Sequence, residues 1–325
     1  METLKSFITG AGGFMGSHLV DFLTEQGHEV SGIYFGPVNL VDEIKNRKNL
    51  IKCDIRNNNK LEEILAKFKP SNIYHLAAQS YPTVSWKYPK KTLDINAGGT
   101  INLLEIVKKL GLHRVLVAGS SAQYGEVHAN EVPVYESHAM RPLHPYGVSK
   151  VAQELLAYQY YKNDGIDCFT MRIFNTTGPR KVNDVCSDFT RQVAAIELGM
   201  QKPVIKVGNL DTQRAITDVR DVIRGFYLAM KHAEPGKAYN ISGSEVYKIR
   251  SILNCALFFG TKNPEVIQDP KLMRSTDEPI IFGNSKKFSK LTCWEQKIPI
   301  RTTIKDMIEY WTSHSEKIKD STRAL

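Results

Sequence analysis

Near its N-terminus the chain reads Leu4-Lys5-Ser6-Phe7-Ile8-Thr9-Gly10-Ala11-Gly12-Gly13-Phe14-Met15-Gly16. The run Leu4–Thr9 is strand-like, and Met15–Gln26 places its apolar residues at helical spacing before the stop signal Gly27. Between a strand and a helix, Gly10 would allow a tight turn, Gly13 a close approach to a pyrophosphate, and Gly16 close packing of helix on strand. The free N–H groups of the helix N-terminus favour phosphate binding. This stretch predicts a dinucleotide site at the start of an α/β fold.

The N-terminal half repeats the strand and helix pattern. Strand-like runs follow at His28–Phe35, Leu50–Ile55, Ile73–Ala78 and Val115–Ala118, and a helix is predicted from about Thr92 to Leu110, closed by Gly111. This alternation is typical of a Rossmann fold, a doubly wound parallel sheet that binds ligands at the carboxyl ends of its strands. We assign residues 1–172 to this cofactor-binding domain.

Beyond about Arg172 the segments become shorter and the loops longer. Strands are predicted at Val204–Val207 and Ala238–Ser242, separated by irregular polar stretches. We interpret residues 173–325 mainly as a smaller α/β lobe that binds the substrate, with a segment at about 215–245 returning to the first domain. The polar tail Ser313–Leu325 is expected to fray.

Composition limits the function. Hydrophobic residues make up 42 % of the chain, no apolar run is long enough to span a bilayer, and a strand-like run as early as Leu4 leaves no room for a signal peptide. We therefore expect a cytoplasmic protein without a membrane partner. Five scattered cysteines and nine histidines form no metal-ligand spacing, so no metal is predicted. The net charge of +9 is dispersed and no nucleic-acid motif is present, which favours an anionic small molecule as ligand.

The motif Tyr146-Gly-Val-Ser-Lys150 suggests catalysis. On a helix the two side chains, four residues apart, lie on one face. A free tyrosine has a pKa of about 10, and a neighbouring Lys ammonium together with a nicotinamide charge is expected to lower it. Tyr146 would then serve as a proton donor or acceptor, with Lys150 anchoring the cofactor ribose. Ser120, at the end of a predicted strand in Gly119-Ser-Ser-Ala-Gln-Tyr-Gly125, would polarise a carbonyl beside Tyr146.

Two further segments accompany this motif, His75-Leu-Ala-Ala-Gln-Ser80 and Asp94-Ile-Asn96. A catalytically inactive, NADP-sensing regulator of the same fold is the alternative from a different functional class. Such proteins typically lose the tyrosine or the lysine, whereas this chain keeps Ser120, Tyr146, Lys150 and Asn96.

Together these motifs resemble the extended short-chain dehydrogenase/reductase (SDR) family. Up to about residue 312 the chain resembles its nucleotide-sugar branch, which includes UDP-glucose epimerases, GDP-mannose 4,6-dehydratases and, most similar, GDP-4-keto-6-deoxy-D-mannose reductases. The resemblance is carried by the segments quoted above and by Phe174-Asn-Thr-Thr-Gly-Pro179, Ser187-Asp-Phe189, Lys206–Arg214 and Thr217–Asp221. The run Val207-Gly-Asn-Leu-Asp-x-x-Arg214 is typical of the GDP-mannose group. The resemblance implies a homodimer, commonly formed through two helices that include the Tyr146 helix.

The resemblance implies a nicotinamide cofactor. Strict NAD enzymes carry an acidic residue at the end of the second strand, but this chain has Tyr34 there, so NADP is favoured slightly and NAD stays open. Asp54 would suit the adenine edge. The full set of predicted cofactor residues is Gly10, Gly13, Phe14, Met15, Gly16, Tyr34, Asp54, Ile55, Leu76, Ala77, Ala78, Gln79, Asn96, Tyr146 and Lys150.

A GDP-sugar substrate is implied in the same way. Arg214 and Arg274 are the candidates for binding the diphosphate, because guanidinium groups match phosphate oxygens. Asp277 would accept hydrogen bonds from the nucleoside, and Asn175 would bind the sugar or diphosphate. Ser80, Ser121 and Asn209 complete the predicted substrate residues.

Ala122 limits which reactions of this family are possible. Dehydratases of this family carry a carboxylate two residues before the tyrosine of the serine loop, where it removes a proton next to the C4 carbonyl; alanine cannot do this. We therefore expect reduction of the C4 ketone of GDP-4-keto-6-deoxy-D-mannose to GDP-D-rhamnose or its 4-epimer. A GDP-mannose 4,6-dehydratase or a nucleotide-sugar 4-epimerase is the alternative within the family.

Overall fold

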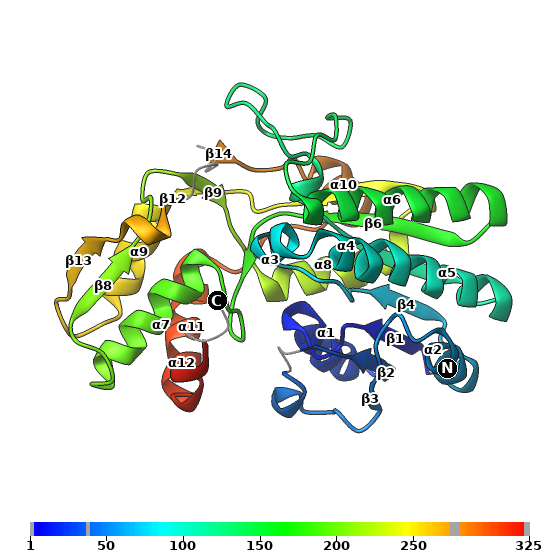
Figure 1. The fold of residues 1–325 in the computed structure, drawn as a ribbon, viewed down its shortest axis with the longest axis horizontal. Helices are drawn as coiled ribbons and strands as arrows, with labels where there is room; N and C mark the ends of the chain where they lie inside the picture. The colour runs from blue at the N-terminus through cyan, green and yellow to red at the C-terminus, as the bar shows by residue number, and fades with distance from the viewer. Residues whose placement is uncertain (1–2, 37–39, 274–279, 322–325) are drawn as a thin grey trace.

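The protein is described here by a computed structural model in which residues 3–36, 40–273 and 280–321 are placed. Its centre is a parallel sheet in the order β11-β6-β5-β4-β1-β2-β3 (Figure 1). The strands are β1 (Lys5–Thr9), β2 (Glu29–Tyr34), β3 (Leu50–Lys52), β4 (Asn72–His75), β5 (Arg114–Ser120), β6 (Asp167–Ile173) and β11 (Ala238–Ile241). The predicted Rossmann fold is thereby confirmed.

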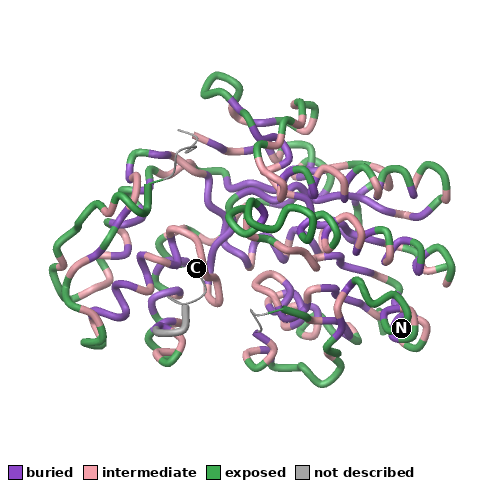
Figure 2. Tube along the Cα trace, in the orientation of Figure 1, coloured by how far each residue is buried: buried purple, intermediate pink, exposed green. Residues whose placement is uncertain are grey.

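Helices cover both faces of this sheet. One face carries α1 (Phe14–Glu25), α8 (Val219–His232) and α10 (Lys286–Thr292). The other carries α2 (Asn58–Phe68), α3 (Pro82–Lys87), α4 (Pro89–Leu93), α5 (Gly99–Leu110) and α6 (Pro145–Asp164). Each layer buries its own apolar cluster against the sheet, the first around Phe226 and the second around Leu103. Figure 2 shows the buried strands between the exposed outer sides of these helices.

The smaller group of elements is built from the C-terminal part of the chain. Its helices are α7 (Val185–Glu197), α9 (Ile249–Phe258), α11 (Ile300–Ser313) and α12 (Glu316–Ser321), and the first three enclose a third apolar cluster with Ile205 and Val207. Its short strands are β7 (Thr176–Thr177), β8 (Val204–Val207), β9 (Gln213–Ala215), β10 (Thr217–Asp218), β12 (Val246–Lys248), β13 (Glu265–Gln268) and β14 (Ile280–Ile281). Single turns complete the fold at η1 (Val41–Glu43), η3 (Ser121–Gln123) and η4 (Pro270–Leu272).

Three local expectations need correction. The third and fourth predicted strands are too long, because β3 ends at Lys52 and β4 at His75. The residues that follow leave the sheet at its carboxyl edge. The tail does not simply fray either: α12 forms and its Ile318 is buried against the C-terminal elements. β6 is a further central strand, and β11 pairs with it in parallel at the sheet edge.

Candidate active site

The glycine loop fits a dinucleotide by its lack of side chains. Gly10 has a φ of +75°, and a Cβ there would lie 2.9 Å from the backbone nitrogen of Ala77. A Cβ on Gly16 would lie 2.1 Å from the carbonyl oxygen of Gly10, so α1 packs this closely on β1 because Gly16 is bare. Gly13 is the N-cap of α1, and no side chain caps the helix. Its first N–H groups therefore suit a pyrophosphate.

The other predicted cofactor residues lie at the ends of adjacent strands. Because β4, β1, β2 and β3 are neighbours in the sheet, their carboxyl ends form one continuous edge. Phe14 and Met15 follow β1, Tyr34 ends β2, Asp54 and Ile55 follow β3, and Leu76, Ala77, Ala78 and Gln79 follow β4. A dinucleotide bound along this edge is the arrangement typical of doubly wound sheets. Their individual roles stay predictions.

Asp54, predicted to meet the adenine, already has a partner. Arg56 donates from its backbone N, Nε and Nη2 to the two Asp54 carboxylate oxygens, at 2.9, 3.1 and 2.7 Å. These hydrogen bonds hold the pKa of Asp54 below its usual value. Both residues line an open depression of about 470 Å³ that extends to Asp94 and Asn102. An adenine at this edge would share Asp54 with Arg56.

Ser120, Tyr146 and Lys150 converge, although β5 and α6 are separated by a long loop. The Ser120 hydroxyl lies close enough to Tyr146 to act on the Tyr146 pKa as a hydrogen-bond donor. Lys150 is buried, its Nζ lies 5.8 Å from the centre of the Tyr146 ring, and it donates to the carbonyl oxygen of Ala118 at 2.8 Å. Pro145 begins α6 and the His144 ring accepts from the backbone N–H of Gly147, which fixes the first helical turn under Tyr146.

Lys150 is not among the influences that set the pKa of Tyr146 in this geometry, and the lowering expected from Lys150 together with a nicotinamide charge stays a prediction. Burial raises the pKa of Tyr146, and the hydrogen bond with Ser120 is the opposing influence. Burial also lowers the pKa of Lys150 to about 7. Desolvation is thus the largest influence on the pKa of both groups. Tyr146 keeps its proton at neutral pH, which suits a proton donor.

Asn96 lies on a helical irregularity that the sequence pattern does not reveal. The predicted helix is continuous from α4 to α5 but contains a π-turn, η2 (Asp94–Gly98). The side chain of Asn96 accepts from the Gln79 backbone N–H at 2.7 Å, and it donates to the Gln79 carbonyl at 3.1 Å and to Ser149 Oγ at 2.8 Å. Such turns are frequent at functional sites. Here the turn connects the loop after β4 to the catalytic helix α6.

His75 is the centre of a buried network of hydrogen-bonded side chains next to Asn96. Thr100 Oγ1 donates to the Asn96 carbonyl, so it accepts from His75 Nε2 at 2.8 Å, and Thr9 Oγ1 lies 2.8 Å from His75 Nδ1. The backbone N–H of Ala77 donates to Thr9 Oγ1, which leaves the Thr9 hydroxyl free to donate to Nδ1. The neutral ring satisfies every one of these contacts. Burial, aided by the charge of Lys150, lowers the pKa of His75 to about 3.

This buried histidine predicts a loss of stability in mild acid. Its pKa is lowered on folding, so its contribution is complete above the unfolded value of about 6.5 and is lost as the pH falls towards the folded value. Between about pH 7.5 and about pH 5 the loss amounts to ~2 kcal/mol of unfolding free energy. In urea unfolding at both pH values, His75→Gln should be less stable at neutral pH but lose less on acidification. An equal loss in variant and wild type would contradict this prediction.

The predicted substrate residues are less closely grouped. Ser121 begins η3 beside Ser120, Ser80 lies in the loop between β4 and α3, and Asn175 follows β6. All three therefore lie at the carboxyl edge of the sheet, near Ser120. Ser80 and Asn175 are exposed. Asn209 and Arg214 belong to the smaller lobe, where Asn209 Oδ1 accepts from the Asp211 N–H at 3.0 Å. Arg214 Nη1 donates to the Gln213 carbonyl at 2.8 Å. Arg274 and Asp277 lie outside the described residues.

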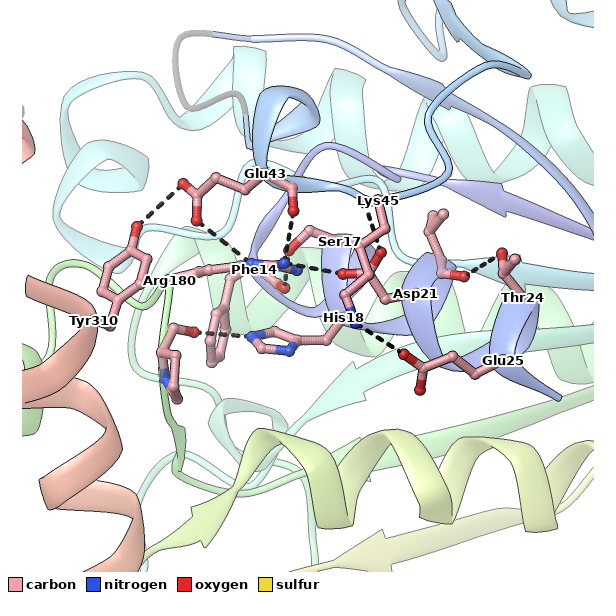
Figure 3. Close-up of polar contacts among 12 residues, drawn as sticks. Phe14, Ser17, His18, Asp21, Thr24, Glu25, Glu43, Lys45, Arg180 and Tyr310 are labelled. Carbon is pink, nitrogen blue, oxygen red and sulfur yellow. Dashed lines mark hydrogen bonds and ion pairs between the residues drawn. The ribbon is translucent and has the colours of Figure 1, made fainter. Parts of the chain in front are cut away.

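A polar cluster that no sequence motif predicted joins α1 to the C-terminal elements (Figure 3). Arg180 donates to Asp21 Oδ2 at 2.9 Å and to the Glu43 carbonyl at 2.8 Å, and its Nε lies 3.4 Å from Glu43 Oε2. Tyr310 and Lys317 also contact the Glu43 carboxylate. His18 Nε2 lies 2.9 Å from the Pro179 carbonyl. The cluster places the loop after β7 against the helix of the glycine loop. No local sequence pattern signals it, because its members come from four distant segments.

The fold and the Ser–Tyr–Lys site define the chain as a nicotinamide-dependent enzyme of the extended SDR class. The family model "GDP-mannose 4,6 dehydratase" matches residues 7–307, and the chain belongs to this family. The resemblance seen in the sequence is thereby confirmed.

Two relatives have different named activities. GDP-6-deoxy-D-mannose reductase from Pseudomonas aeruginosa is 30 % identical over 313 residues, which cover 96 % of this chain and 98 % of the relative. GDP-mannose 4,6 dehydratase from Homo sapiens is 27 % identical, with 93 % and 90 % covered. Among solved structures, RMD from Pseudomonas aeruginosa complexed with NADPH is 28 % identical and superimposes with a TM-score of 0.85 over 96 % of this chain and 99 % of that one. UDP-glucose 4-epimerase from Thermus thermophilus complexed with NAD is 26 % identical, with a TM-score of 0.83 and coverage of 94 % and 99 %.

Among the described residues, no helix is both long and apolar enough to cross a membrane. Within the same part of the chain, no group of three or more His, Cys, Asp or Glu side chains is placed to hold a metal ion.

Proposed function

We propose that the enzyme reduces the C4 ketone of GDP-4-keto-6-deoxy-D-mannose, giving GDP-D-rhamnose or its 4-epimer. The observation that carries this proposal is the combination of a complete Ser120, Tyr146 and Lys150 site with Ala122 at the position of the dehydratase carboxylate. A family member that can exchange a proton at O4 but has no base for C5 is suited to reduction and not to elimination.

The site residues have separate tasks in this reaction. The bound reduced nicotinamide supplies the hydride for C4. Tyr146 donates its phenolic proton to the oxygen on C4 as the ketone becomes an alcohol, and Ser120 donates a hydrogen bond to the same oxygen. Lys150 would hold the cofactor ribose. Because burial keeps Tyr146 protonated, the acid needed for reduction is in place before the substrate binds.

The decisive experiment offers the enzyme several sugar nucleotides. GDP-4-keto-6-deoxy-D-mannose with NADPH or NADH should give cofactor oxidation and a 6-deoxyhexose product by NMR. Formation of the 4-keto sugar from GDP-mannose would establish a dehydratase instead, and interconversion of 4-epimers without net cofactor oxidation would establish an epimerase. Cofactor binding without turnover of any candidate would indicate the sensing regulator.

NADPH is the cofactor that we propose as preferred. Support comes from Tyr34 at the end of β2, where no carboxylate would repel a 2′-phosphate. The basic residues nearby are engaged elsewhere, since Lys45 pairs with Glu25 and Arg47 with Asp42. The preference is therefore expected to be modest. Titration with NADPH and NADH would test it, and tighter binding of NADH would reverse the assignment.

A homodimer is also part of the proposal. Large apolar side chains are exposed on the layer formed by α3 to α6, and Trp86 is 64 % exposed there. The others are Val84, Tyr88, Leu93, Ile101, Val148, Leu155 and Tyr158. Exposed apolar patches of this kind mark association surfaces. These residues belong to α3, α4, α5, α6 and the turn between α3 and α4, on the sheet face that carries α6.

Leu155→Glu is expected to convert the dimer into a monomer in sedimentation analysis, because a carboxylate would have to be buried without a partner. Phe258→Glu is the matched control, since Phe258 is equally apolar and exposed but lies on α9 in the smaller lobe. A monomeric wild type, or a Leu155→Glu variant that stays dimeric, would refute this interface.

We also propose a cytoplasmic location. It is supported by the five cysteines, which are all free thiols, since disulfides are rare in reducing compartments. Localisation of the tagged protein by cell fractionation would test it, and recovery from a secreted fraction would contradict it.

A further inference from the structure

Behind the catalytic serine lies a buried side chain that the proposed chemistry does not use. Gln123 is 0 % exposed. Its Oε1 accepts from the backbone N–H of Ser120 at 2.7 Å, and its Nε2 donates to Glu154 Oε2 at 2.7 Å. One contact requires an acceptor and the other a donor, and an amide supplies both without a charge. The orientation of the Gln123 side chain is therefore dictated by its partners.

Gln123 and Ser120 form the two halves of a capping box around η3. In the reciprocal hydrogen bond, Ser120 Oγ accepts from the backbone N–H of Ala122 at 3.2 Å. Since Oγ accepts within the loop, its own O–H remains to be donated outward, towards Tyr146. The S-x-x-Q spacing is present in the sequence, but only the fold shows that both hydrogen bonds of the capping box form.

The far end of Gln123 is attached to a rigid anchor. Glu154 forms a buried ion pair with Arg172, in which Arg172 Nε donates to Glu154 Oε2 at 2.8 Å. Arg172 also donates to Tyr124 Oη at 2.8 Å and to the Glu136 carbonyl at 2.9 Å. Gly119 makes room for the amide, because a Cβ there would lie 2.5 Å from Gln123 Oε1. The serine loop is thus connected through one side chain to α6 and β6.

We propose that Gln123 is a positioning residue that holds the Ser120 backbone so that the Ser120 hydroxyl meets Tyr146 and the reacting oxygen. This inference rests on the part of the proposed function that gives Ser120 its hydrogen bond to the substrate oxygen. It extends the site from the three reacting side chains to the link from Gln123 to the Glu154–Arg172 pair.

Two variants separate positioning from mere folding. Gln123→Met keeps the length of the side chain but loses both hydrogen bonds, and its kcat should fall about 10- to 100-fold, as for a misplaced catalytic hydrogen bond. The dissociation constant for NADPH, which needs neither bond, should stay near that of the wild type. A folded Gln123→Met enzyme with wild-type kcat would overturn the proposal.

Gln123→Glu adds a pH-dependent readout. The new carboxylate could still accept from Ser120, but it would face Glu154 and the two would share one proton. Below the raised pKa of that pair the kcat should approach the wild-type value, and as the pH rises through it kcat should fall about tenfold or more relative to wild type. The matched control is Gln26→Glu, an exposed substitution at the end of α1. Its kcat should show the same pH dependence as that of the wild type. A constant ratio of variant to wild type at every pH would also overturn the proposal.

The third measurement needs no substrate. The Ser120 hydroxyl acts to lower the pKa of Tyr146. The absorbance of the Tyr146 phenolate is obtained as the difference between each protein and its Tyr146→Phe counterpart. In Gln123→Met this absorbance should appear at higher pH than in wild type. An unchanged Tyr146 titration would count against positioning. If the wild type does not reduce GDP-4-keto-6-deoxy-D-mannose, the proposed function fails, while this titration still decides the role of Gln123.

Discussion

Tyr146→Phe is expected to lower the rate of ketone reduction by about 10³-fold, within the range that a positioned general acid contributes. The phenol is the group that can hand a proton to the C4 oxygen, and burial keeps that proton in place at neutral pH. Because the ring remains, the site should keep its shape and NADPH should bind with nearly unchanged affinity. Stopped-flow or steady-state cofactor oxidation with the GDP-4-keto sugar measures the effect.

The matched control is Tyr135→Phe, which removes a hydroxyl from an exposed tyrosine in the loop before α6 and should leave kcat unchanged. If Tyr146→Phe retained kcat within a few-fold of wild type, the assignment of the acid would be wrong. Loss of cofactor binding together with turnover would instead point to a structural role for the hydroxyl.

Glu154→Leu should destabilise the protein by about 3–5 kcal/mol, the usual cost of removing one partner of a buried ion pair. Arg172 would keep its charge in a place from which water is excluded, since it is 4 % exposed. Burial acts against this charge, and the paired Glu154 carboxylate is what raises the pKa of Arg172 above its ordinary value. The variant also loses the anchor of Gln123, so stability and turnover should fall together. Urea unfolding followed by circular dichroism measures the first effect.

An exposed pair provides the comparison. Lys45 and Glu25 lie 3.2 Å apart with most of both side chains in solvent, so Lys45→Met should change the unfolding free energy by less than about 1 kcal/mol. A loss of that small size in Glu154→Leu would mean that Arg172 finds water or another partner, and that the network does not support the serine loop in the way described.

The buried network also explains why the effects of Glu154 and Gln123 should differ in kind. Glu154 compensates a charge, so its loss affects the whole fold. Gln123 is neutral and satisfies one backbone N–H and one carboxylate oxygen, so its loss should be felt mainly at Ser120. A double variant would test this coupling, because residues in one hydrogen-bond network are not additive.

The amino-acid sequence by itself determined the class of fold and indicated the side chains that we propose as the reacting ones. The glycine loop, the alternation of strands and helices, and Tyr146 with Lys150 are local patterns whose spacing is meaningful wherever the chain goes. Ser120 was recognised because it ends a predicted strand. Ligand binding at the carboxyl ends of the strands was predicted from the doubly wound class of fold.

The tertiary structure decided what surrounds those side chains. The π-turn at Asn96, the Gln123–Glu154–Arg172 link and the Arg180 cluster join residues far apart in the sequence, so they depend on packing that no local window contains. The motif did not reveal that burial raises the pKa of Tyr146 and lowers that of Lys150, because the spacing of the two residues says nothing about burial, and desolvation is the largest effect on both groups. Helical spacing put Tyr146 and Lys150 on one face of α6. The fold brought Ser120 beside them, and the depth at which it buries Tyr146 and Lys150 shifted their pKa values.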